Sequence, residues 1–127
     1  MGFQLLSILI ANDSSVLCEN CFDSYNLPLP LDFTPSASTS RLYGNAPNDI
    51  LKNFASENIT INLHHDGVTP STYQNNPKLS AFVDLLSTNV DRKGNIFGSS
   101  FEAKKFPIYA TQYHPERNSV KFKNYII

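Results

Sequence analysis

The sequence of 127 residues lacks tryptophan, any run of basic residues and any long hydrophobic segment. Ten lysines and arginines face eleven acidic residues, and none of the ten precedes Arg41, so nucleic-acid binding has no support. The apolar start, residues 1–11, is too short to span a bilayer and has no positive flank, so we expect neither a signal peptide nor membrane association. With 41% hydrophobic and 17% charged residues, the chain can form one globular domain.

Cysteine is scarce as well, with only Cys18 and Cys21, in the pattern Cys-Glu-Asn-Cys. A redox-active pair of this spacing needs a helix N-terminus or positive neighbours, whereas the residues around this pair are acidic. We therefore expect a structural disulfide or two free thiols. A zinc site that also used His64 and His65 would reach four ligands, but the spacing matches no standard zinc motif.

Residues 106–117 read Phe-Pro-Ile-Tyr-Ala-Thr-Gln-Tyr-His-Pro-Glu-Arg, and the alternation over 106–113 predicts a strand that ends at His114. Pro115 cannot donate a ladder hydrogen bond and biases His114 toward extended geometry. Because side chains two apart in extended backbone point the same way, His114 and Glu116 should share one side. A carboxylate beside an imidazole fixes its tautomer, as the orienter does for the base in a nucleophilic triad. The alternative is a histidine that merely ends a strand.

Hydrophobic spacing predicts the other elements. Residues 2–17 form a largely apolar helix and residues 47–56 a short one that begins at a proline. The proline-containing run 27–34 is extended but cannot be a central strand, and 36–40 is a polar linker. The remaining predictions are a strand at 58–63, a helical turn at 77, strands at 83–90, 96–101 and 106–113, and a hairpin loop at 91–95. The last three strands indicate an antiparallel meander.

Two further motifs carry chemistry. Asn12 and Asn58 each begin an Asn-x-Ser/Thr sequon, for which chance occurrence is the alternative to glycosylation. His64 and His65 directly follow the strand predicted at 58–63, just before a glycine turn, and are candidate functional residues. The alternative for both is a solvent-exposed loop histidine.

The segment 112–117, Gln-Tyr-His-Pro-Glu-Arg, resembles the Gln-Trp-His-Pro-Glu-Lys segment of class I glutamine amidotransferase-like enzymes. Three runs narrow the likeness to the gamma-glutamyl hydrolases, which trim polyglutamate tails from folates: Met-Gly-Phe-Gln at 1–4, the run 27–34 and Ser-Arg-Leu-Tyr at 40–43. The likeness covers 1 to about 118. It implies that 1–127 is a single partial domain, the C-terminal part of a flavodoxin-like three-layer α/β fold, truncated at both ends and lacking a closing C-terminal helix.

The resemblance implies a cysteine-type hydrolase that cleaves gamma-glutamyl bonds of folylpoly-gamma-glutamate with a Cys-His-Glu triad. His114 and Glu116 match the histidine and glutamate, whereas the cysteine would precede Met1, so we expect the chain as it stands to be inactive. Gly2 lies beside the expected oxyanion position, and His64 matches a histidine linked to substrate handling. No metal or organic cofactor is needed.

The family further implies a vacuolar, lysosomal or extracellular location, and it allows a homodimer of the full-length protein. Two alternatives stay open. One is the glutaminase domain of a biosynthetic amidotransferase, with a synthase partner, against which the run 27–34 and the two sequons argue. The other is a non-catalytic remnant that binds a ligand or partner, which the missing nucleophile favours.

Overall fold

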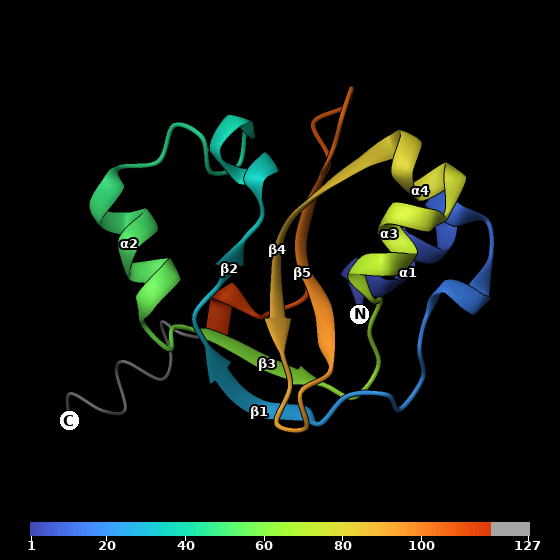
Figure 1. Cartoon of the computed structure of the whole chain (residues 1–127), viewed down its shortest axis with the longest axis horizontal. Helices are drawn as coiled ribbons and strands as arrows, with labels where there is room; N and C mark the ends of the chain where they lie inside the picture. The colour runs from blue at the N-terminus through green and yellow to red at the C-terminus, as the bar shows by residue number, and fades with distance from the viewer. Residues whose placement is uncertain (118–127) are drawn as a thin grey trace.

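The computed structural model describes residues 1–117 (Figure 1). Short helices and strands follow one another along the chain, and the strands carry most of the long-range pairing. The elements are α1 Gly2–Ala11, the 3-10 helix η1 Ser14–Val16, β1 Ser24–Leu29, β2 Asp32–Phe33, the 3-10 helix η2 Pro35–Thr39, α2 Asn48–Ser56, β3 Thr60–His64, α3 Pro70–Asn75, α4 Pro77–Phe82, β4 Val83–Val90, β5 Ile96–Ala103 and β6 Tyr109–Thr111.

Two antiparallel sheets organise these elements. β1 and β3 form a two-stranded sheet, in which Ser24 is paired with His64 and Leu29 with Thr60. The second sheet has the strand order β2-β4-β5-β6, and each neighbouring pair is antiparallel. The predicted meander of β4, β5 and β6 is confirmed, and so is the mixed α/β class. No two strands within residues 1–117 pair in parallel, so the flavodoxin-like three-layer fold stays a prediction.

A first hydrophobic cluster joins α1, α3 and α4 to the four-stranded sheet, and these three helices stand together on one side of β4 and β5 in Figure 1. The buried ring of Phe3 lies 5.0 Å from that of Phe101 on β5 and 6.2 Å from that of Tyr73 on α3. Ser7 Oγ donates to the Phe3 carbonyl and lies 2.8 Å from the Tyr73 hydroxyl. The sheet therefore holds the first turns of α1 in place.

A second cluster lies on the other side of the sheet, toward α2 and η2, and contains Leu31, Ala37, Tyr43, Leu86 and Tyr113. A chain of hydroxyl groups crosses it, because the Tyr43 hydroxyl donates to Ser100 Oγ (3.0 Å) and lies 3.0 Å from the Tyr113 hydroxyl. Since Tyr113 directly precedes His114, this buried contact anchors the backbone just before the predicted base.

α1 is shorter than the helix predicted over 2–17. It ends at Ala11, and Asn12 takes a left-handed backbone with φ of 50°. The Asp13 carboxylate then accepts from the Ser15 N–H (2.9 Å), which starts η1. Asparagine, aspartate and serine compete with the helix for backbone hydrogen bonds, so the helix stops although the apolar spacing continues.

Two other predictions need correction, and one helix was not predicted. The linker at 36–40 is mostly the 3-10 helix η2, which begins at Pro35. The strand at 106–113 is only β6, because Pro107 has no N–H to donate and the Ile108 N–H turns back to the Phe106 carbonyl (2.8 Å). Helix α3, whose first turn is capped by the Thr69 side chain, was not predicted at all.

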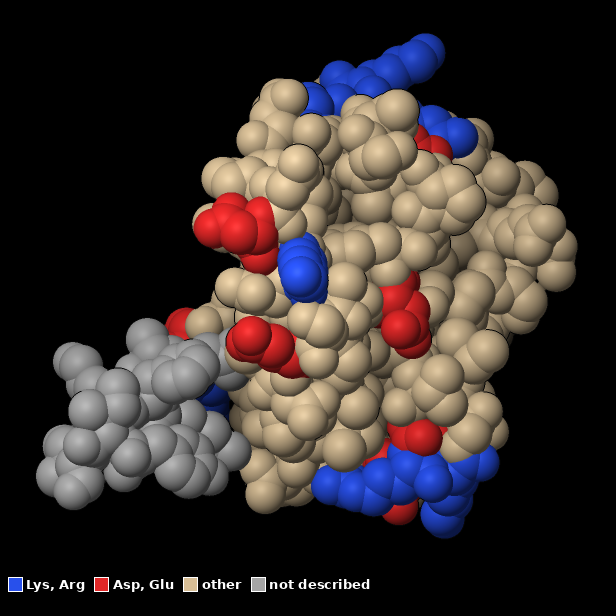
Figure 2. Space-filling view, turned by 60° about the vertical axis from the view of Figure 1, so that its left-hand side comes forward, with Lys and Arg blue, Asp and Glu red and all other residues tan. Residues whose placement is uncertain are grey.

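The remaining elements agree with the sequence. The strand at 83–90 and the helical turn before it are confirmed, the run 27–34 forms β1 and β2 at sheet edges, and Gly94 in the hairpin loop has φ of 87°. The expectation that the chain lacks a closing C-terminal helix concerns residues 118–127, which are outside the described residues. Among the helices of residues 1–117, none has the length and apolar composition to cross a membrane. Figure 2 shows acidic and basic side chains in small separate groups on one face.

Candidate active site

His114 lies where the two sheets approach each other. Its backbone N–H donates to the Ile61 carbonyl on β3 (3.0 Å), whereas the Gln112 N–H donates to the Ser99 carbonyl on β5 (2.8 Å). The backbone then becomes helical over 115–117, and the Arg117 N–H donates to the His114 carbonyl (3.2 Å). The prediction of extended backbone through His-Pro-Glu is therefore wrong, because proline suits the first position of a helical turn as well as a strand end.

The predicted pairing of His114 with Glu116 is nevertheless confirmed, with 2.8 Å between Nδ1 and Oε1. Because a carboxylate only accepts, the proton of the neutral imidazole lies on Nδ1, and Nε2 keeps its lone pair. The hydrogen bond from His114 holds the pKa of Glu116 below its ordinary value. The two side chains are 35% and 66% exposed, so a ligand can reach the pair.

A cavity of about 370 Å³ joins this pair to the start of α1. Its walls are Met1, Gly2, Phe3 and Leu6 on one side and residues 109–116 on the other. In the described structure no side chain caps the first turn of α1, and that turn contains no acidic residue. The N–H groups of this turn therefore have no helical partner and, with the helix dipole, favour an anion such as a thiolate or an oxyanion.

Gly2 is the first residue of α1 and lines this cavity, where the sequence placed the oxyanion region. A Cβ at Gly2 would meet no atom within 4 Å, so the space beside its Cα is open. The role of Gly2 in binding an oxyanion stays a prediction.

Gln4 connects three segments of the site that are remote in sequence. Its Nε2 donates to the Asp66 carbonyl (2.9 Å) and to Gln112 Oε1 (3.3 Å). Gln112 is buried and lies two residues before His114, while the Asp66 carbonyl also accepts from His64 Nδ1 (2.8 Å). Gln4 lies in the matched run 1–4 and Gln112 in the matched run 112–117, and these matches were the sequence signal that could have identified them. Only the fold brings the two side chains together.

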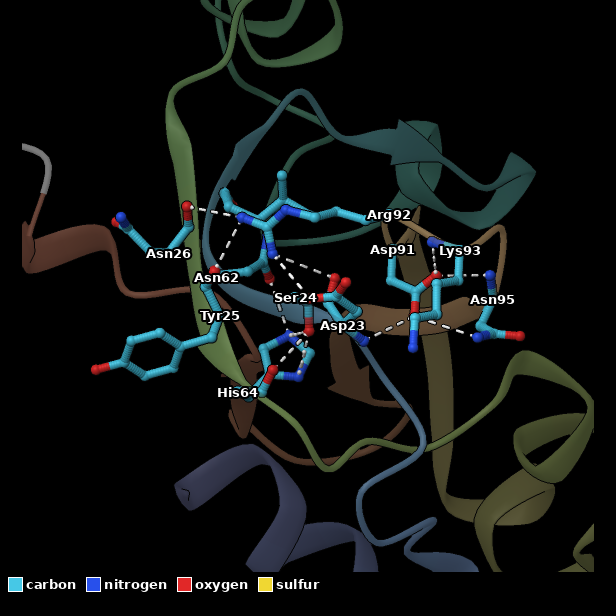
Figure 3. A network of polar contacts seen from close by, with 11 residues as sticks. Asp23, Ser24, Tyr25, Asn26, Asn62, His64, Asp91, Arg92, Lys93 and Asn95 are labelled. Atoms are coloured by element: carbon cyan, nitrogen blue, oxygen red, sulfur yellow. Dashed lines mark hydrogen bonds and ion pairs between the residues drawn. The ribbon is translucent and has the colours of Figure 1, made fainter.

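His64 ends β3 inside a polar network (Figure 3). Its Nε2 lies 3.1 Å from Asn62 Oδ1, and Ser24 Oγ donates to its backbone carbonyl (2.7 Å). The edge of the imidazole packs against the ring of Phe97, with 4.7 Å between centroids. His64 is 7% exposed and does not line the cavity of His114, so its role in substrate handling stays a prediction.

The protonation of His64 follows from this burial. Burial lowers the pKa of His64 to about 4, although the hydrogen bond to the Asp66 carbonyl acts in the opposite direction. The positive charges of the amino terminus and of His114 lower this pKa further. Near neutral pH His64 is therefore uncharged. The adjacent His65 is exposed, and its ring stacks on that of Tyr25 at 5.6 Å.

The hairpin loop 91–95 holds the strand that faces His64. The Asp91 carboxylate accepts from the backbone N–H of Asp23 (2.8 Å), and Arg92 forms an ion pair with the Asp23 carboxylate (3.1 Å). Arg92 also donates to the carbonyls of Tyr25 and Asn26, as Figure 3 shows. Ser24 lies between these contacts, so the loop fixes the neighbour of His64 from outside.

Cys18 and Cys21 form a disulfide, with 5.6 Å between their Cα atoms. Of the two predicted states, the structural disulfide is confirmed and the pair of free thiols is not. Neither sulfur is therefore free to act as a nucleophile or a zinc ligand. Cys18 also exchanges two backbone hydrogen bonds with Gly67 (2.8 and 3.2 Å), next to the Asp66 carbonyl that His64 uses. Within residues 1–117, no three metal-ligating side chains are grouped as a metal site would require.

Known proteins resemble this chain along most of its length, although no protein-family model matches it. Gamma-glutamyl hydrolase B of Dictyostelium discoideum is 38% identical over 118 residues, which are 93% of this chain and 33% of that protein. Gamma-glutamyl hydrolase of Rattus norvegicus is 37% identical over 123 residues, 97% of this chain and 38% of that protein. The Homo sapiens gamma-glutamyl hydrolase is 34% identical over 124 residues, 98% and 38% of the two chains. The chain thus spans about a third of the length of the curated relatives that it matches.

Proposed function

Since the chain is related to the gamma-glutamyl hydrolases along nearly its whole length, we propose that it carries the histidine–glutamate half of a cysteine-type hydrolase site. The substrate is folylpoly-gamma-glutamate, and the bond cleaved is a gamma-glutamyl amide. One observation carries this proposal: the 2.8 Å contact between His114 Nδ1 and Glu116 Oε1 lies at a cavity that also holds the N-terminus of α1.

In this mechanism His114 is the general base, because Glu116 holds the proton on Nδ1 and leaves Nε2 free. Nε2 takes the thiol proton, the thiolate attacks the gamma-glutamyl carbonyl, and the imidazolium returns the proton to the leaving amine. Backbone N–H groups at the start of α1, including that of Gly2, bind the oxyanion. Water, deprotonated by His114, then hydrolyses the thioester.

The nucleophile in this proposal is a cysteine directly before Met1 in a longer chain, because Cys18 and Cys21 are joined to each other. His64 affects substrate handling through the turn that contains Asp66, because the Asp66 carbonyl accepts hydrogen bonds from both Gln4 and His64. The whole protein has the flavodoxin-like three-layer fold, of which residues 1–127 are a part. A vacuolar, lysosomal or extracellular location is supported by the disulfide, which persists in oxidising compartments.

The test compares the chain 1–127 with a longer protein that continues upstream through Gly-x-Cys. Hydrolysis of a gamma-glutamyl peptide is measured for both, before and after alkylation with iodoacetamide. We expect no hydrolysis by 1–127, and hydrolysis by the longer protein that alkylation stops. Turnover by 1–127 itself, or turnover that resists alkylation, would overturn the cysteine mechanism.

A second candidate is a non-catalytic binding protein, which is favoured because residues 1–117 contain no free cysteine. Binding of polyglutamate by a longer protein that does not hydrolyse it would select this candidate.

A further inference from the structure

Two sequons, Asn12-Asp13-Ser14 and Asn58-Ile59-Thr60, are left without a role by the proposed site. Both asparagines are exposed, so the sequence motif alone does not distinguish them. The structure does distinguish them, because the transferase that modifies such asparagines must also reach the serine or threonine two residues later.

The sequon at Asn12 is open throughout. Asn12 follows the last residue of α1 in a left-handed conformation, so the chain turns away from the helix there. Asn12, Asp13 and Ser14 are all exposed, and the Asp13 carboxylate is occupied by the Ser15 N–H (2.9 Å). No residue among those described forms a hydrogen bond with the Asn12 carboxamide or the Ser14 hydroxyl. The motif therefore presents both of its reactive side chains to solvent.

The third residue of the sequon at Asn58, Thr60, is buried. Thr60 has an exposed fraction of 0% and pairs with Leu29 between β3 and β1. Its Oγ1 donates to the Leu29 carbonyl (2.6 Å). A transferase can bind the Thr60 hydroxyl only when β1 and β3 separate.

We propose that Asn12 is an N-glycosylation site that stays open in the folded protein, whereas Asn58 accepts a glycan only before β1 and β3 pair. The donor is a lipid-linked oligosaccharide. The amide nitrogen of Asn12 forms a bond to the anomeric carbon, the bond from that carbon to the lipid pyrophosphate breaks, and the amide proton passes to the transferase. The pyrophosphate leaves as an anion.

Two independent features of the structure agree with this assignment. The Cys18–Cys21 disulfide indicates an oxidising compartment, which is the kind of compartment where such transfer takes place. Asn12 also lies at the end of α1 opposite to Gly2, about 15 Å away along a helix of ten residues. A glycan on Asn12 would therefore leave the cavity of His114 uncovered.

The experiment uses the purified, folded chain 1–127, a single-subunit oligosaccharyltransferase and a short synthetic lipid-linked oligosaccharide. Peptides covering 8–16 and 54–62 serve as acceptors without the fold, and mass spectrometry gives the initial rate at each asparagine. Relative to its own peptide, we expect Asn12 in the folded chain to react faster than Asn58 by about tenfold or more, because local opening must precede reaction at Asn58.

Matched variants locate the sugar. Asn12→Gln should remove most of the transfer to the folded chain, and Asn58→Gln should leave it unchanged. Equal normalised rates at the two sites would overturn the proposal, and so would a lack of transfer to Asn12 in either the peptide or the protein. None of these outcomes depends on hydrolase activity, so this proposal and the proposed function fail separately.

Discussion

His114 follows β6 and His64 ends β3, yet the surroundings of the two imidazoles differ in burial and in the partner of the ring. His114 engages one ring nitrogen with a carboxylate and is partly exposed beside a cavity. His64 is buried, donates from Nδ1 to a backbone carbonyl oxygen, and has a pKa lowered to about 4. The first arrangement suits a proton carrier, and the second suits a neutral group that fixes a turn.

This contrast shows that burial and the identity of the partner, rather than the strand-end position, separate the two roles. A carboxylate stabilises the imidazolium that forms when a base takes a proton. Backbone and amide oxygens in a buried site are neutral, so they provide no negative charge that would stabilise it. If the contrast is correct, substitutions at the two histidines should change different measurable quantities.

The largest expected effect is on catalysis. In a longer protein that contains the upstream cysteine, His114→Ala should lower kcat by on the order of 10⁴-fold or more, because the base acts on the thiol directly. His64→Ala should raise KM and leave alkylation of the thiol intact. The measurement is steady-state hydrolysis of a gamma-glutamyl peptide for both variants. Hydrolysis that survives His114→Ala would show that the base is another residue.

Glu116→Ala should have a smaller effect, a loss of roughly 10²- to 10⁴-fold in kcat, because water can partly replace an orienting carboxylate. Glu116→Gln is the matched control, since its amide oxygen can still accept from Nδ1 but carries no charge. The difference in kcat between these two variants measures the contribution of the charge. A Glu116→Ala variant with unchanged kcat would remove this residue from the mechanism.

Several strands and the contact between His114 and Glu116 could be predicted from the sequence. Alternation and turn residues predicted β4, its hairpin loop and β5, and the spacing of His114 and Glu116 predicted their contact. The contact arises from a helical turn rather than from extended backbone, because a Pro at position 115 is compatible with either. Local sequence alone cannot distinguish these two conformations.

Long-range side-chain contacts were not accessible. The bond from Gln4 to Gln112 spans 108 residues, and no local pattern encodes it. Thr60, Asn62 and His64 of β3 are all buried, and the β1 carbonyls of Leu29 and Leu27 accept hydrogen bonds from the side chains of Thr60 and Asn62. Tertiary pairing here overrides the usual assignment of the polar face of a strand to water.

The burial of His64 predicts a pH-dependent stability. Its pKa falls from an ordinary 6.5 in the unfolded chain to about 4 in the folded protein, so the unfolded state binds more protons between these values. The free energy of unfolding should therefore decrease by about 3 kcal/mol through this group as the pH falls from 7 to 4. Urea unfolding at a series of pH values measures this loss.

The wild-type chain provides the control for this measurement. His64→Gln should reduce the slope of stability against pH between 6.5 and 4. Equal slopes for the wild-type chain and His64→Gln would mean that the burial of His64 does not depress its pKa.

The smallest predicted effect concerns the anchor ahead of His114. Tyr113→Phe removes the hydroxyl next to that of Tyr43 and should lower the free energy of unfolding by about 1 kcal/mol. Tyr109→Phe, at an exposed tyrosine of β6, should change it by less than about 0.5 kcal/mol. Thermal unfolding of both variants compares these values, and a larger loss for Tyr109→Phe would contradict the role of the buried hydroxyl chain.

The most direct test of the histidine–glutamate pair is ¹⁵N-detected NMR of the imidazole rings in the chain 1–127. At a pH where His114 is neutral, the pairing predicts its proton on Nδ1, and Glu116→Ala should abolish that preference. His64 serves as the internal reference, because its signals should not respond to Glu116→Ala. A proton on Nε2 of His114 in the intact chain, or a His114 spectrum that Glu116→Ala leaves unchanged, would contradict the assignment of His114 and Glu116 as base and orienter.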